Sequence, residues 1–554
     1  MFASTLALGL LAFLPLSWAT PASGHDVKQI AIIGAGAAGS SAAYHLKKYA
    51  DVAGIPINVT IFEKTGRIGG RTLTVNVYDD PILPIELGAS IFVDVNYILS
   101  NATREFGLLT VDPGADEDGL LGIWDGSSFV YTQDSRSWNW VNLAKLFWKY
   151  GTAPYHTKKL VQNTVATFLQ LYDEPFFPFR SLSTRAFQLG LVKITGLTGQ
   201  QFLAKNKLDG AFARDIVQAG TRVNYASNLE YIHGLGAMVA MAPEGAKAID
   251  GGNWQIFSNM VEVSGAKAYL NTSVRDLALD PDKKYRLKTI TAPSGDSRAE
   301  PLSHSSAFDD VIIAAPFQFA NISTEEHLIQ HPVDTIPYAT LHVTLFASPY
   351  KFSAEFFKMP PASDIPISVL TTLGADEEAR PGSAGAGKAG FYSATLQRIV
   401  MNPRTHSPEY VYKIFSPEAV TPEFLAALLG VEIPGSFPRD IPDDSTVNPI
   451  SWFHATVFHP YPQQYPRVTF QDPILRDGLY YTSGIESFIS TMETSALMGA
   501  NVARLIVDDY AGISRPEEDL IGVMPVYGTE QDDATKLQMQ TVYHGEGDAN
   551  VNEL

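Results

Sequence analysis

The chain has 554 residues, and its 40 Lys and Arg side chains against 59 Asp and Glu give a formal net charge of −19. Such a charge repels phosphate backbones and argues against a nucleic-acid partner. Apolar residues make up 45% of the chain, which indicates a folded protein, and the length predicts more than one domain. The absence of cysteine excludes disulfides, thiolate metal centres and a cysteine nucleophile, and no metal site is expected.

Residues 1–19 have the pattern of a secretory signal peptide. Their apolar run is interrupted by Pro15, is short for a membrane span and ends in the small-x-small triplet Ser17-Trp18-Ala19. Four glycosylation triplets agree with export, at Asn58, Asn101, Asn271 and Asn321. We expect a protein of the secretory pathway, either secreted or held in a lysosome-like or vacuole-like vesicle; a retained anchor and a buried N-terminal segment stay open as alternatives.

The first motif with chemistry is a strand, a glycine-rich turn and a helix, in that order. Residues 27–33 form a β-branched run, and residues 40–49 have helical composition. The turn between them reads Gly34-Ala35-Gly36-Ala37-Ala38-Gly39. Its glycines permit a tight turn, a close approach to a pyrophosphate and close packing of helix on strand, while the helix N-terminus attracts the anion. The next strand, 57–62, ends at Glu63, 24 residues after Gly39, where a carboxylate accepts hydrogen bonds from a ribose. The sequence therefore predicts a dinucleotide site.

The residues after Glu63 favour FAD over a nicotinamide cofactor. They read Lys64-Thr65-Gly66-Arg67-Ile68-Gly69-Gly70-Arg71-Thr72. The adjacent glycines permit close backbone approach, and Arg71 offers a planar pair of donors to the pyrophosphate. The stretch resembles the flavoprotein oxidases that include the amine oxidases. This resemblance implies that Lys64, Gly70, Arg71 and Thr72 contact FAD.

Two strands are expected to extend the FAD site. Gly88, Ala89 and Ser90 end the strand of residues 85–92, and their small side chains allow the flavin ring to lie against the backbone; a tight strand bend is the alternative. The strand of residues 267–274 is expected to bring the backbone of Val274 to the adenine. A further strand, 308–316, is expected to close the sheet.

A second motif lies near the C-terminus. Residues 478–486 read as a strand that ends in Gly484 and Glu486, and a helix follows through Ile506. We predict that Ser490 and Glu493 form the capping box of this helix. Its N-terminus, with Met492, is expected to stabilise negative charge at the N1 and C2 carbonyl edge of the flavin, and Glu486 to hold the ribityl-phosphate region.

The middle of the chain is less specific. Residues 137–179 show helical stripes of apolar residues, Leu143, Leu146, Phe147 and Tyr150 and then Val161, Val165, Phe168 and Tyr172. We expect these stripes to face the core; lining an apolar substrate cavity and peripheral contact with a membrane are the alternatives. Residues 280–304 read as a polar excursion between strands, residues 381–387 as a flexible surface loop or lid, and the acidic residues beyond Tyr510 as a draped or disordered tail.

Three blocks together resemble the prenylcysteine oxidases, also called prenylcysteine lyases. The blocks are residues 34–44; Thr221-Arg222-Val223-Asn224-Tyr225 with residues 244–253; and residues 479–486 with 492–496. Where this family tends to show Gly-Gly-Ser followed by a histidine, the chain has Gly88-Ala89-Ser90 and then Val93, which leaves room for a different substrate.

The resemblance implies an α/β fold with a Rossmann-type FAD-binding domain, as in the amine-oxidase-like flavoproteins, interleaved with an α+β substrate domain. We expect the FAD-binding domain to comprise residues 25–100, 250–316 and 470–510, the substrate domain residues 101–249 and 317–469, and the acidic tail residues 511–554.

The resemblance also implies FAD-dependent oxidation of an S-prenylcysteine thioether. Hydride passes to flavin N5, water adds to the carbon next to sulfur, and the products are cysteine, a prenyl aldehyde and, with O2 as acceptor, hydrogen peroxide. Our candidates on the substrate side are Arg222 for the amino-acid carboxylate and Asn224 and Tyr225 for water or the ammonium, with His454 and His459 as further proton carriers. A flavin oxidase for another allylic, sulfur or amine substrate and a non-catalytic FAD-fold binding protein stay open as alternatives.

Overall fold

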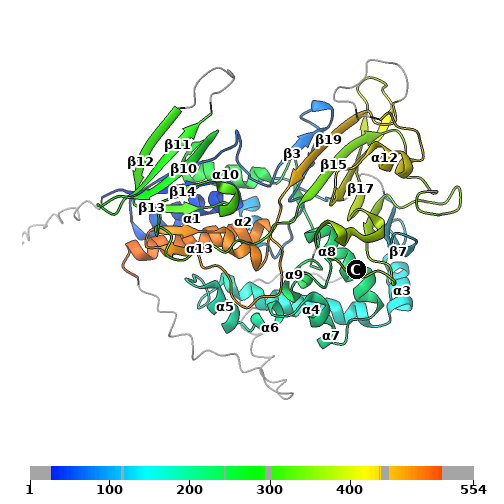
Figure 1. The fold of residues 1–554 in the computed structure, drawn as a ribbon, viewed down its shortest axis with the longest axis horizontal. Coiled ribbons are helices and arrows are strands. Elements are labelled where there is room, and N and C mark those ends of the chain that lie inside the picture. Colours follow the sequence, from blue (N-terminus) through cyan, green and yellow to red (C-terminus); the bar gives the residue numbers. More distant parts are fainter. Residues whose placement is uncertain are drawn as a thin grey trace, which may run out of the picture.

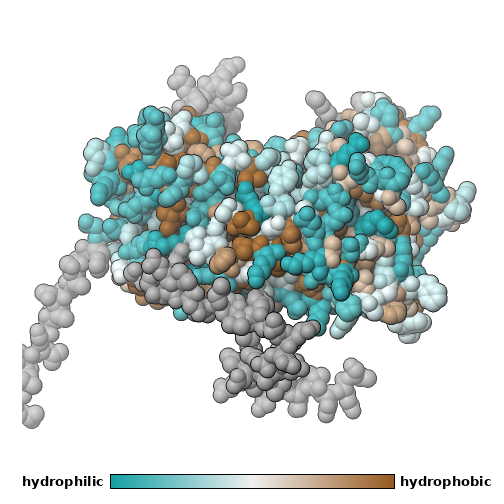
Figure 2. Space-filling view, turned by 60° about the horizontal axis from the view of Figure 1, so that its bottom comes forward, coloured by the Kyte–Doolittle hydropathy of each residue, from teal (hydrophilic) through white to brown (hydrophobic). Residues whose placement is uncertain are grey.

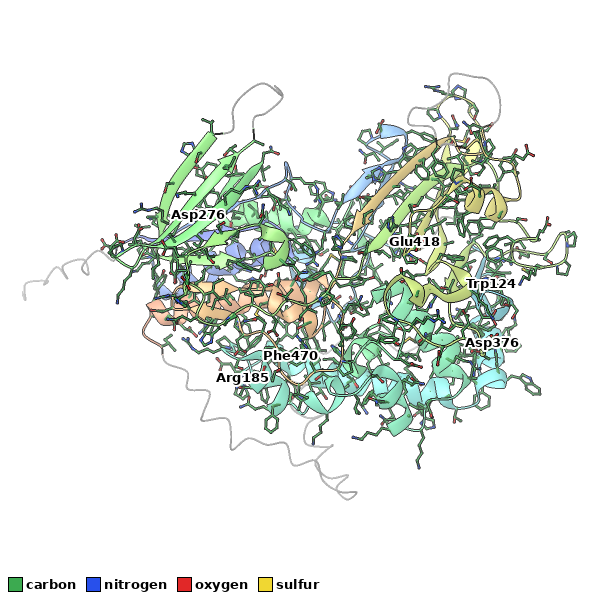
Figure 3. The ribbon with its side chains drawn as sticks, viewed as in Figure 1. Trp124, Arg185, Asp276, Asp376, Glu418 and Phe470 are labelled. Carbon is green, nitrogen blue, oxygen red and sulfur yellow. The ribbon has the colours of Figure 1, made fainter. Side chains whose placement is uncertain are left out.

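The computed structural model describes residues 26–113, 118–242, 245–292, 302–435, 437 and 448–513. The expected signal peptide and nearly all of the expected tail lie outside these residues. The chain forms two halves side by side, with α1, α13 and a small sheet in one and a larger sheet above a row of helices in the other (Figure 1). Figure 3 labels Asp276 in the first half and Trp124 and Asp376 in the second.

A six-stranded sheet organises the first half. Its order is β20-β21-β13-β1-β2-β9, and the strands run parallel except β20, which is antiparallel to β21. Its strands are β1 (Lys28–Ile33), β2 (Ile57–Phe62), β9 (Lys267–Tyr269), β13 (Asp310–Ile313), β20 (Ile474–Arg476) and β21 (Leu479–Tyr481). The β-branched runs of β1 and β13 are buried, as is usual for a parallel sheet covered on both faces. β13 lies inside the sheet and β20 forms the edge, so the expectation that 308–316 closes the sheet was wrong.

Two long helices and a shorter one cover one face of this sheet. They are α1 (Ala37–Ala53), α13 (Met492–Tyr510) and α10 (Trp254–Ser264). α1 and α13 contribute Leu46, Val502 and Ile506 to one core with Ile32 of β1. The two helices touch at Gly499, where an added Cβ would lie 2.2 Å from the carbonyl oxygen of Ala38. The architecture confirms the predicted α/β class with a Rossmann-type unit.

A four-stranded sheet in the order β12-β11-β10-β14 covers the other face, and its core includes Val274, Leu277 and Tyr285. The strands are β10 (Thr272–Leu279), β11 (Tyr285–Thr291), β12 (Leu302–Phe308) and β14 (Ser323–Thr324). Two expectations were wrong here. The strand expected over residues 267–274 is divided into β9 and β10, with Asn271 at a φ of 53° between them, and the polar stretch 280–304 contains β11 and the start of β12.

A seven-stranded sheet in the order β19-β15-β18-β17-β16-β6-β7 organises the second half, and its pairs are antiparallel except β6 with β16. The strands are β6 (Leu120–Trp124), β7 (Phe129–Asp134), β15 (Leu341–Ser348), β16 (Ser368–Thr371), β17 (Ser393–Met401), β18 (Pro408–Ser416) and β19 (Trp452–Phe458). Helix α12 (Pro422–Leu429) packs Leu425 and Leu428 against it. The expected loop 381–387 belongs to a short 3-10 segment, η4 (Gly382–Ala389), in which Gly385 and Ala386 are buried; a wholly flexible surface loop was therefore a wrong expectation.

A row of helices lies beneath this sheet (Figure 1). It comprises α3 (Asn139–Tyr150), α4 (Ala153–Leu169), α5 (Leu182–Gln188), α6 (Val192–Thr195), α7 (Gly199–Lys205), α8 (Gln218–Tyr225) and α9 (Gly234–Val239), with η2 (Gln170–Tyr172) and η3 (Ala213–Val217) between them. The stripe on α4 does face the core, through Val161 and Phe168. On α3, however, Leu143 and Phe147 are exposed, so the core prediction was wrong for these two residues.

The remaining elements are short. They are β3 (Thr74–Asn76), η1 (Val77–Asp79), β4 (Pro84–Glu86), α2 (Tyr97–Glu105), β5 (Thr110–Val111), β8 (Ala248–Ile249), α11 (Phe317–Ala320) and η5 (Ser483–Ser487). In the space-filling view from below, most of the face is polar and apolar side chains gather near its centre (Figure 2). Within the described part of the chain, no helix is long and apolar enough to cross a membrane.

Candidate FAD site and its surroundings

The glycine turn leads from β1 into α1 as predicted. Gly34 has a φ of 107°, and a Cβ there would lie 2.8 Å from the carbonyl oxygen of Ala314, so only glycine fits. α1 begins after Gly36 with no side chain capping it and no acidic residue in its first turn. The first N–H groups of α1, including those of Ala37, Ala38 and Gly39, therefore form an uncapped positive helix end of the kind that binds a pyrophosphate.

Glu63 lies at the carboxyl end of β2, beside this turn. Its buried carboxylate accepts hydrogen bonds from the backbone N–H of Ala35 at 2.8 Å and from the N–H and hydroxyl of Thr65, each at 2.8 Å. The Glu63 carboxylate therefore lies against the glycine turn, where the sequence predicted an acceptor for the ribose hydroxyls. Lys64 is exposed, and its ammonium lies 3.5 Å from the carbonyl oxygen of Phe319.

The second glycine pair lies directly against the first turn. The N–H of Gly69 donates to the carbonyl of Ala35 at 2.9 Å, and a Cβ on Gly70 would come within 2.9 Å of the Cα of Gly36. The guanidinium of Arg67 donates to the carbonyls of Ile68, Gly70 and Thr72, and Thr72 itself is buried. Arg67 thus holds the loop that carries Arg71, a role the sequence did not reveal.

Arg71 and Glu486 form a two-pronged ion pair. The Nη1 and Nη2 atoms of Arg71 donate to the Glu486 carboxylate at 2.8 and 2.7 Å, and Arg71 also donates to the carbonyl of Pro460. The hydroxyl of Tyr338 donates to Glu486 at 3.1 Å. Burial alone would lower the pKa of Arg71, but the charge and hydrogen bonds of Glu486 raise it above its ordinary value.

This ion pair was not foreseen, although each residue was predicted to serve the cofactor. Glu486 is buried, whereas the Arg71 side chain keeps 36% of its surface exposed. Because the Arg71 guanidinium is both oriented and partly accessible, the pair suits an anchored cation for an anionic group.

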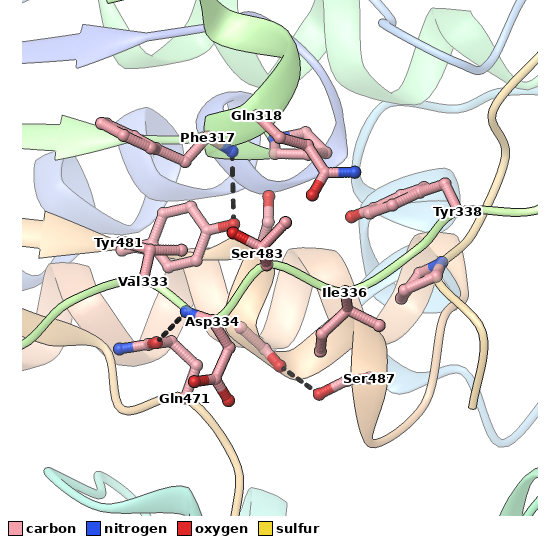
Figure 4. Close-up of a pocket in the computed structure, with 14 residues that line it drawn as sticks. Phe317, Gln318, Val333, Asp334, Ile336, Tyr338, Gln471, Tyr481, Ser483 and Ser487 are labelled. Carbon is pink, nitrogen blue, oxygen red and sulfur yellow. Dashed lines mark hydrogen bonds between the residues drawn. The ribbon is translucent and has the colours of Figure 1, made fainter. Parts of the chain in front are cut away.

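A cavity of about 100 Å³ lies beside the ion pair, at the carboxyl ends of β13 and β21 (Figure 4). Gly484 and Ser487 of η5 line it together with Phe317, Tyr338 and Tyr481. The N–H of Phe317 faces the Tyr481 hydroxyl at 3.4 Å, and the Ser487 hydroxyl donates to the carbonyl of Gly484 at 3.1 Å. Ligands of parallel sheets bind at this edge of the sheet, which places the cavity on the cofactor side.

The start of α13 differs from the prediction. Thr491 is the N-cap and forms a capping box with Thr494, so the expected pair of Ser490 and Glu493 was wrong. Glu493 instead accepts hydrogen bonds from the N–H groups of Ile98 and Leu99, at 2.9 and 3.0 Å, and so caps helix α2. Met492 is the first residue of α13 and is buried.

The strand expected over residues 85–92 was wrong, because β4 ends at Glu86 and Gly88, Ala89 and Ser90 follow it. This segment lies beside an unexpected charged group. The ammonium of Lys413, a buried lysine on β18, donates to the Ser90 hydroxyl and to the carbonyl of Glu86, both at 3.0 Å. The Asn253 amide donates to the carbonyl of Ala89 at 2.9 Å, and a Cβ on Gly88 would lie 2.7 Å from the Arg71 carbonyl oxygen. A lone lysine in the apolar run Tyr410–Phe415 is the signal that sequence reading missed.

Burial perturbs both ionisable groups beside this segment. It raises the pKa of Glu86 to about 7 and lowers the pKa of Lys413 to about 8, although the opposite charges of the two groups act against these shifts. One Glu86 oxygen accepts the N–H of Asn253 at 2.6 Å, while Oε2 is buried with no hydrogen-bond partner. An orphaned polar atom of this kind fits a site that a bound group or water completes.

The Glu86 shift predicts a pH dependence of stability. Its folded pKa lies above that of an unfolded glutamate, so the folded protein binds the extra proton, and this contribution is lost as pH rises through about 7. Relative to Glu86→Gln, the wild-type protein should lose about 2–3 kcal/mol of unfolding free energy between pH 4.5 and 7.5. Urea unfolding of both proteins at the two pH values measures this difference, and equal pH dependence would contradict it.

The three predicted substrate-side residues lie on or at the end of α8, but they do not converge on an open site. Arg222 is fully buried, and its guanidinium donates to the carbonyls of Gly385 and Ala386 and to the Thr371 hydroxyl, at 2.6, 2.8 and 2.9 Å. The Asn224 amide donates to the carbonyls of Gly220 and Ala240, at 3.0 and 3.1 Å. These contacts favour structural roles for Arg222 and Asn224.

Tyr225 is buried and packs against the partly buried ring of Tyr461. The two rings meet edge to face, with 5.4 Å between their centroids. Burial raises the pKa of Tyr461, and the nearby hydroxyls of Tyr392 and Tyr225 add to the shift. His459 stacks on Phe319, and His454 lies on β19 with its pKa lowered by burial. Among the described residues, no hydrogen bond joins His454 or His459 to the three predicted residues of α8.

Comparisons with known proteins agree with this architecture. Cyclohexylamine oxidase from Brevibacterium oxydans superposes with a TM-score of 0.51 at 16% identity, covering 87% of this chain and 99% of the other. A fatty acid isomerase from P. acnes superposes with a TM-score of 0.53 at 12% identity over the same shares. At these identities the likeness concerns the fold.

The fold, the glycine turn, Glu63 and the Arg71 loop define a flavoprotein oxidoreductase. The family model "Prenylcysteine lyase" matches residues 133–517, and "NAD(P)-binding Rossmann-like domain" matches residues 32–106. The chain belongs to the prenylcysteine lyase family and is an FAD-dependent oxidoreductase.

Two curated relatives span nearly the whole chain. Farnesylcysteine lyase of Arabidopsis thaliana is 27% identical over 500 residues, 87% of this chain and 88% of its own length. Prenylcysteine oxidase 1 of Bos taurus is 29% identical over 546 residues, 93% of this chain and 96% of its own length.

Proposed function

We propose that this protein oxidises S-prenylcysteine thioethers with O2 as the electron acceptor. The observation that carries the proposal is that the family match runs from residue 133 to residue 517. It therefore includes five strands of the seven-stranded sheet, β15 to β19, and the helices beneath it, and it does not depend on the generic dinucleotide turn at residues 34–39. The names of the full-length relatives, a farnesylcysteine lyase and a prenylcysteine oxidase, support the same substrate class.

The proposed reaction is balanced by one water and one O2 for each thioether. The carbon next to sulfur loses two electrons and a proton as hydride, water adds to that carbon, and the carbon–sulfur bond breaks. The products are cysteine, a prenyl aldehyde and hydrogen peroxide. FAD, when bound, accepts the hydride and passes the electrons to O2, so the protein supplies position and charge.

The chain's own residues have separable roles in this proposal. The α1 N-terminus, Glu63 and Arg71 hold the dinucleotide, with Arg71 oriented by Glu486. Lys413 maintains a buried positive charge at the Gly88–Ser90 segment, and this charge would stabilise negative charge on a flavin ring bound against the segment. Val274, on β10 of the four-stranded sheet, remains the proposed adenine neighbour.

The proposed activity is tested on purified protein that carries FAD. S-farnesylcysteine added without oxygen is expected to bleach the visible flavin absorbance, and air should restore it with release of peroxide and farnesal. Farnesol and cysteine, added separately, are the controls. If the flavin absorbance persisted with S-farnesylcysteine but bleached with an amine or another allylic compound, the enzyme would be assigned to a different substrate class.

We also propose that the chain enters the secretory pathway, with a signal peptide at residues 1–19, and is secreted or held in a vesicle. All four candidate glycosylation asparagines, Asn58, Asn101, Asn271 and Asn321, are exposed, which supports N-glycans there. Mass spectrometry of protein from a eukaryotic host should find Thr20 at the N-terminus and a mass loss after enzymatic deglycosylation. An unprocessed, unglycosylated chain would contradict both.

A further inference from the structure

Helix α3 and its flanks present a surface of large apolar side chains. We call this surface the aromatic ridge; its side chains are between 62% and 93% exposed. The ridge consists of Trp138, Trp140, Leu143, Phe147, Trp148 and Tyr155. It holds three of the seven tryptophans of the whole chain. Such a run, on α3, the residue before it and the start of α4, exceeds the scattered apolar residues that every protein exposes.

Apolar side chains of α3 lie on its outward side as well as on the side that faces the protein. Asn142 and Tyr150 are buried and Leu146 partly so, and they lie on the side of α3 that faces the protein. At about 100° per residue, Trp140, Leu143, Ala144, Phe147 and Trp148 occupy an arc of roughly 140° on the opposite side. α3 lies at the edge of the molecule beside β7, so this arc can meet a broad surface (Figure 1).

The charge of the segment that carries the ridge is opposite to that of the chain. Residues 135–172 contain no Asp or Glu, although the chain carries 59 of them, and they include Arg136, Lys145, Lys149, Lys158 and Lys159. Some of these cations have partners within the protein: Arg136 pairs with Asp134 and Asp364, and Lys149 with Asp215. The segment therefore combines interfacial aromatic residues with local positive charge in an acidic protein.

We propose that the aromatic ridge docks the protein on a lipid bilayer that contains anionic headgroups. Tryptophan and tyrosine favour the boundary between headgroups and hydrocarbon, and lysines beside them are attracted to anionic lipid. A symmetric contact between two copies is disfavoured, because it would bring the two basic segments opposite each other. The purpose of docking, access to a prenylated substrate that partitions into membranes, rests on the proposed function; the binding itself does not.

Flotation of the full-length, FAD-loaded protein with phosphatidylcholine vesicles, with and without phosphatidylserine, tests the proposal. Wild-type protein should float with the anionic vesicles, and brominated lipid should quench part of its tryptophan fluorescence. The variant Trp140→Ser/Phe147→Ser/Trp148→Ser should bind at least about tenfold more weakly. Lys145→Gln/Lys159→Gln should weaken binding to the anionic vesicles only.

The matched control replaces three equally exposed apolar residues on other elements, as Val52→Ser/Ile82→Ser/Leu109→Ser, and should float like wild type. The proposal would be overturned if wild-type protein did not bind the vesicles or showed no quenching. It would also be overturned if analytical ultracentrifugation showed a wild-type dimer that the ridge variant does not form. Oxidation of soluble S-farnesylcysteine should be equal in wild type and ridge variant. If wild-type protein floated with the vesicles but did not oxidise S-farnesylcysteine, the proposed function would be refuted and the proposed docking surface would still be supported.

Discussion

Replacing Arg222 with methionine is expected to lower the free energy of unfolding by about 3–5 kcal/mol. The guanidinium is fully buried, and its donors satisfy the carbonyls of Gly385 and Ala386 and the hydroxyl of Thr371. Methionine has similar length but no donors, so these carbonyls would be left buried and unpaired. Burial also lowers the pKa of Arg222 to about 10, which is still high enough to keep it charged at neutral pH.

The measurement for Arg222 is urea unfolding followed by circular dichroism. Arg214→Met is the matched control, because Arg214 lies one helical segment earlier and its side chain is half exposed; its effect should stay within about 0.5 kcal/mol. The loss of unfolding free energy in Arg222→Lys should lie between those of the other two variants, because lysine keeps a charge but not the planar set of donors. A stable Arg222→Met protein whose KM for S-farnesylcysteine alone rises would instead assign Arg222 to the substrate carboxylate.

Replacing Glu486 with glutamine should release FAD by freeing Arg71. Glutamine can accept only one of the two Arg71 hydrogen bonds and has no charge, so the guanidinium would lose its orientation. We expect a 10- to 100-fold rise in the FAD dissociation constant, together with a loss of about 2–3 kcal/mol in stability; the latter is moderated because Arg71 is about one-third exposed.

Titration of the apoprotein with FAD measures the first effect and urea unfolding the second. A double-mutant cycle with Arg71→Met separates the ion pair from each residue's other contacts. Asp51→Asn breaks the exposed ion pair with Lys47 and serves as the control, with an expected change below about 0.5 kcal/mol. If Glu486→Gln bound FAD with unchanged affinity while Arg71→Met did not, Arg71 would hold the cofactor without help from Glu486.

Local sequence features predicted the dinucleotide turn correctly. The β-branched run of β1, the glycines from Gly34 to Gly39 and the acid at Glu63 interact over short stretches of chain. Steric demands at such a turn are local, so a Cβ that cannot fit at Gly34 can be anticipated from motif and spacing. The later strand and helix on either side of Glu486 were also predicted, but the strand ends at Tyr481, and Gly484 and Glu486 lie in the 3-10 segment η5. The cap residues of the helix were misplaced by one.

Pairings between distant segments could not be anticipated. Arg71 meets Glu486 across 415 positions, Lys413 meets Ser90 across 323, and Glu493 caps a helix 395 positions away. In the polar stretch before β13, β12 is exposed along almost its whole length and has no alternating pattern to mark it as a strand. β11 does alternate between buried and exposed residues, and that signal was missed.

The sequence by itself determined the cofactor class, the family and the glycine turn, because these depend on residue types at short spacing. Only the tertiary structure decided which predicted arginine is accessible: Arg71 remains partly exposed, whereas Arg222 is buried and donates to buried carbonyls. It also decided which side of α3 meets the core. Periodicity reports that apolar residues share a face, but burial depends on what packs there, and on α3 the helix turns Trp140, Phe147 and Trp148 to the outside.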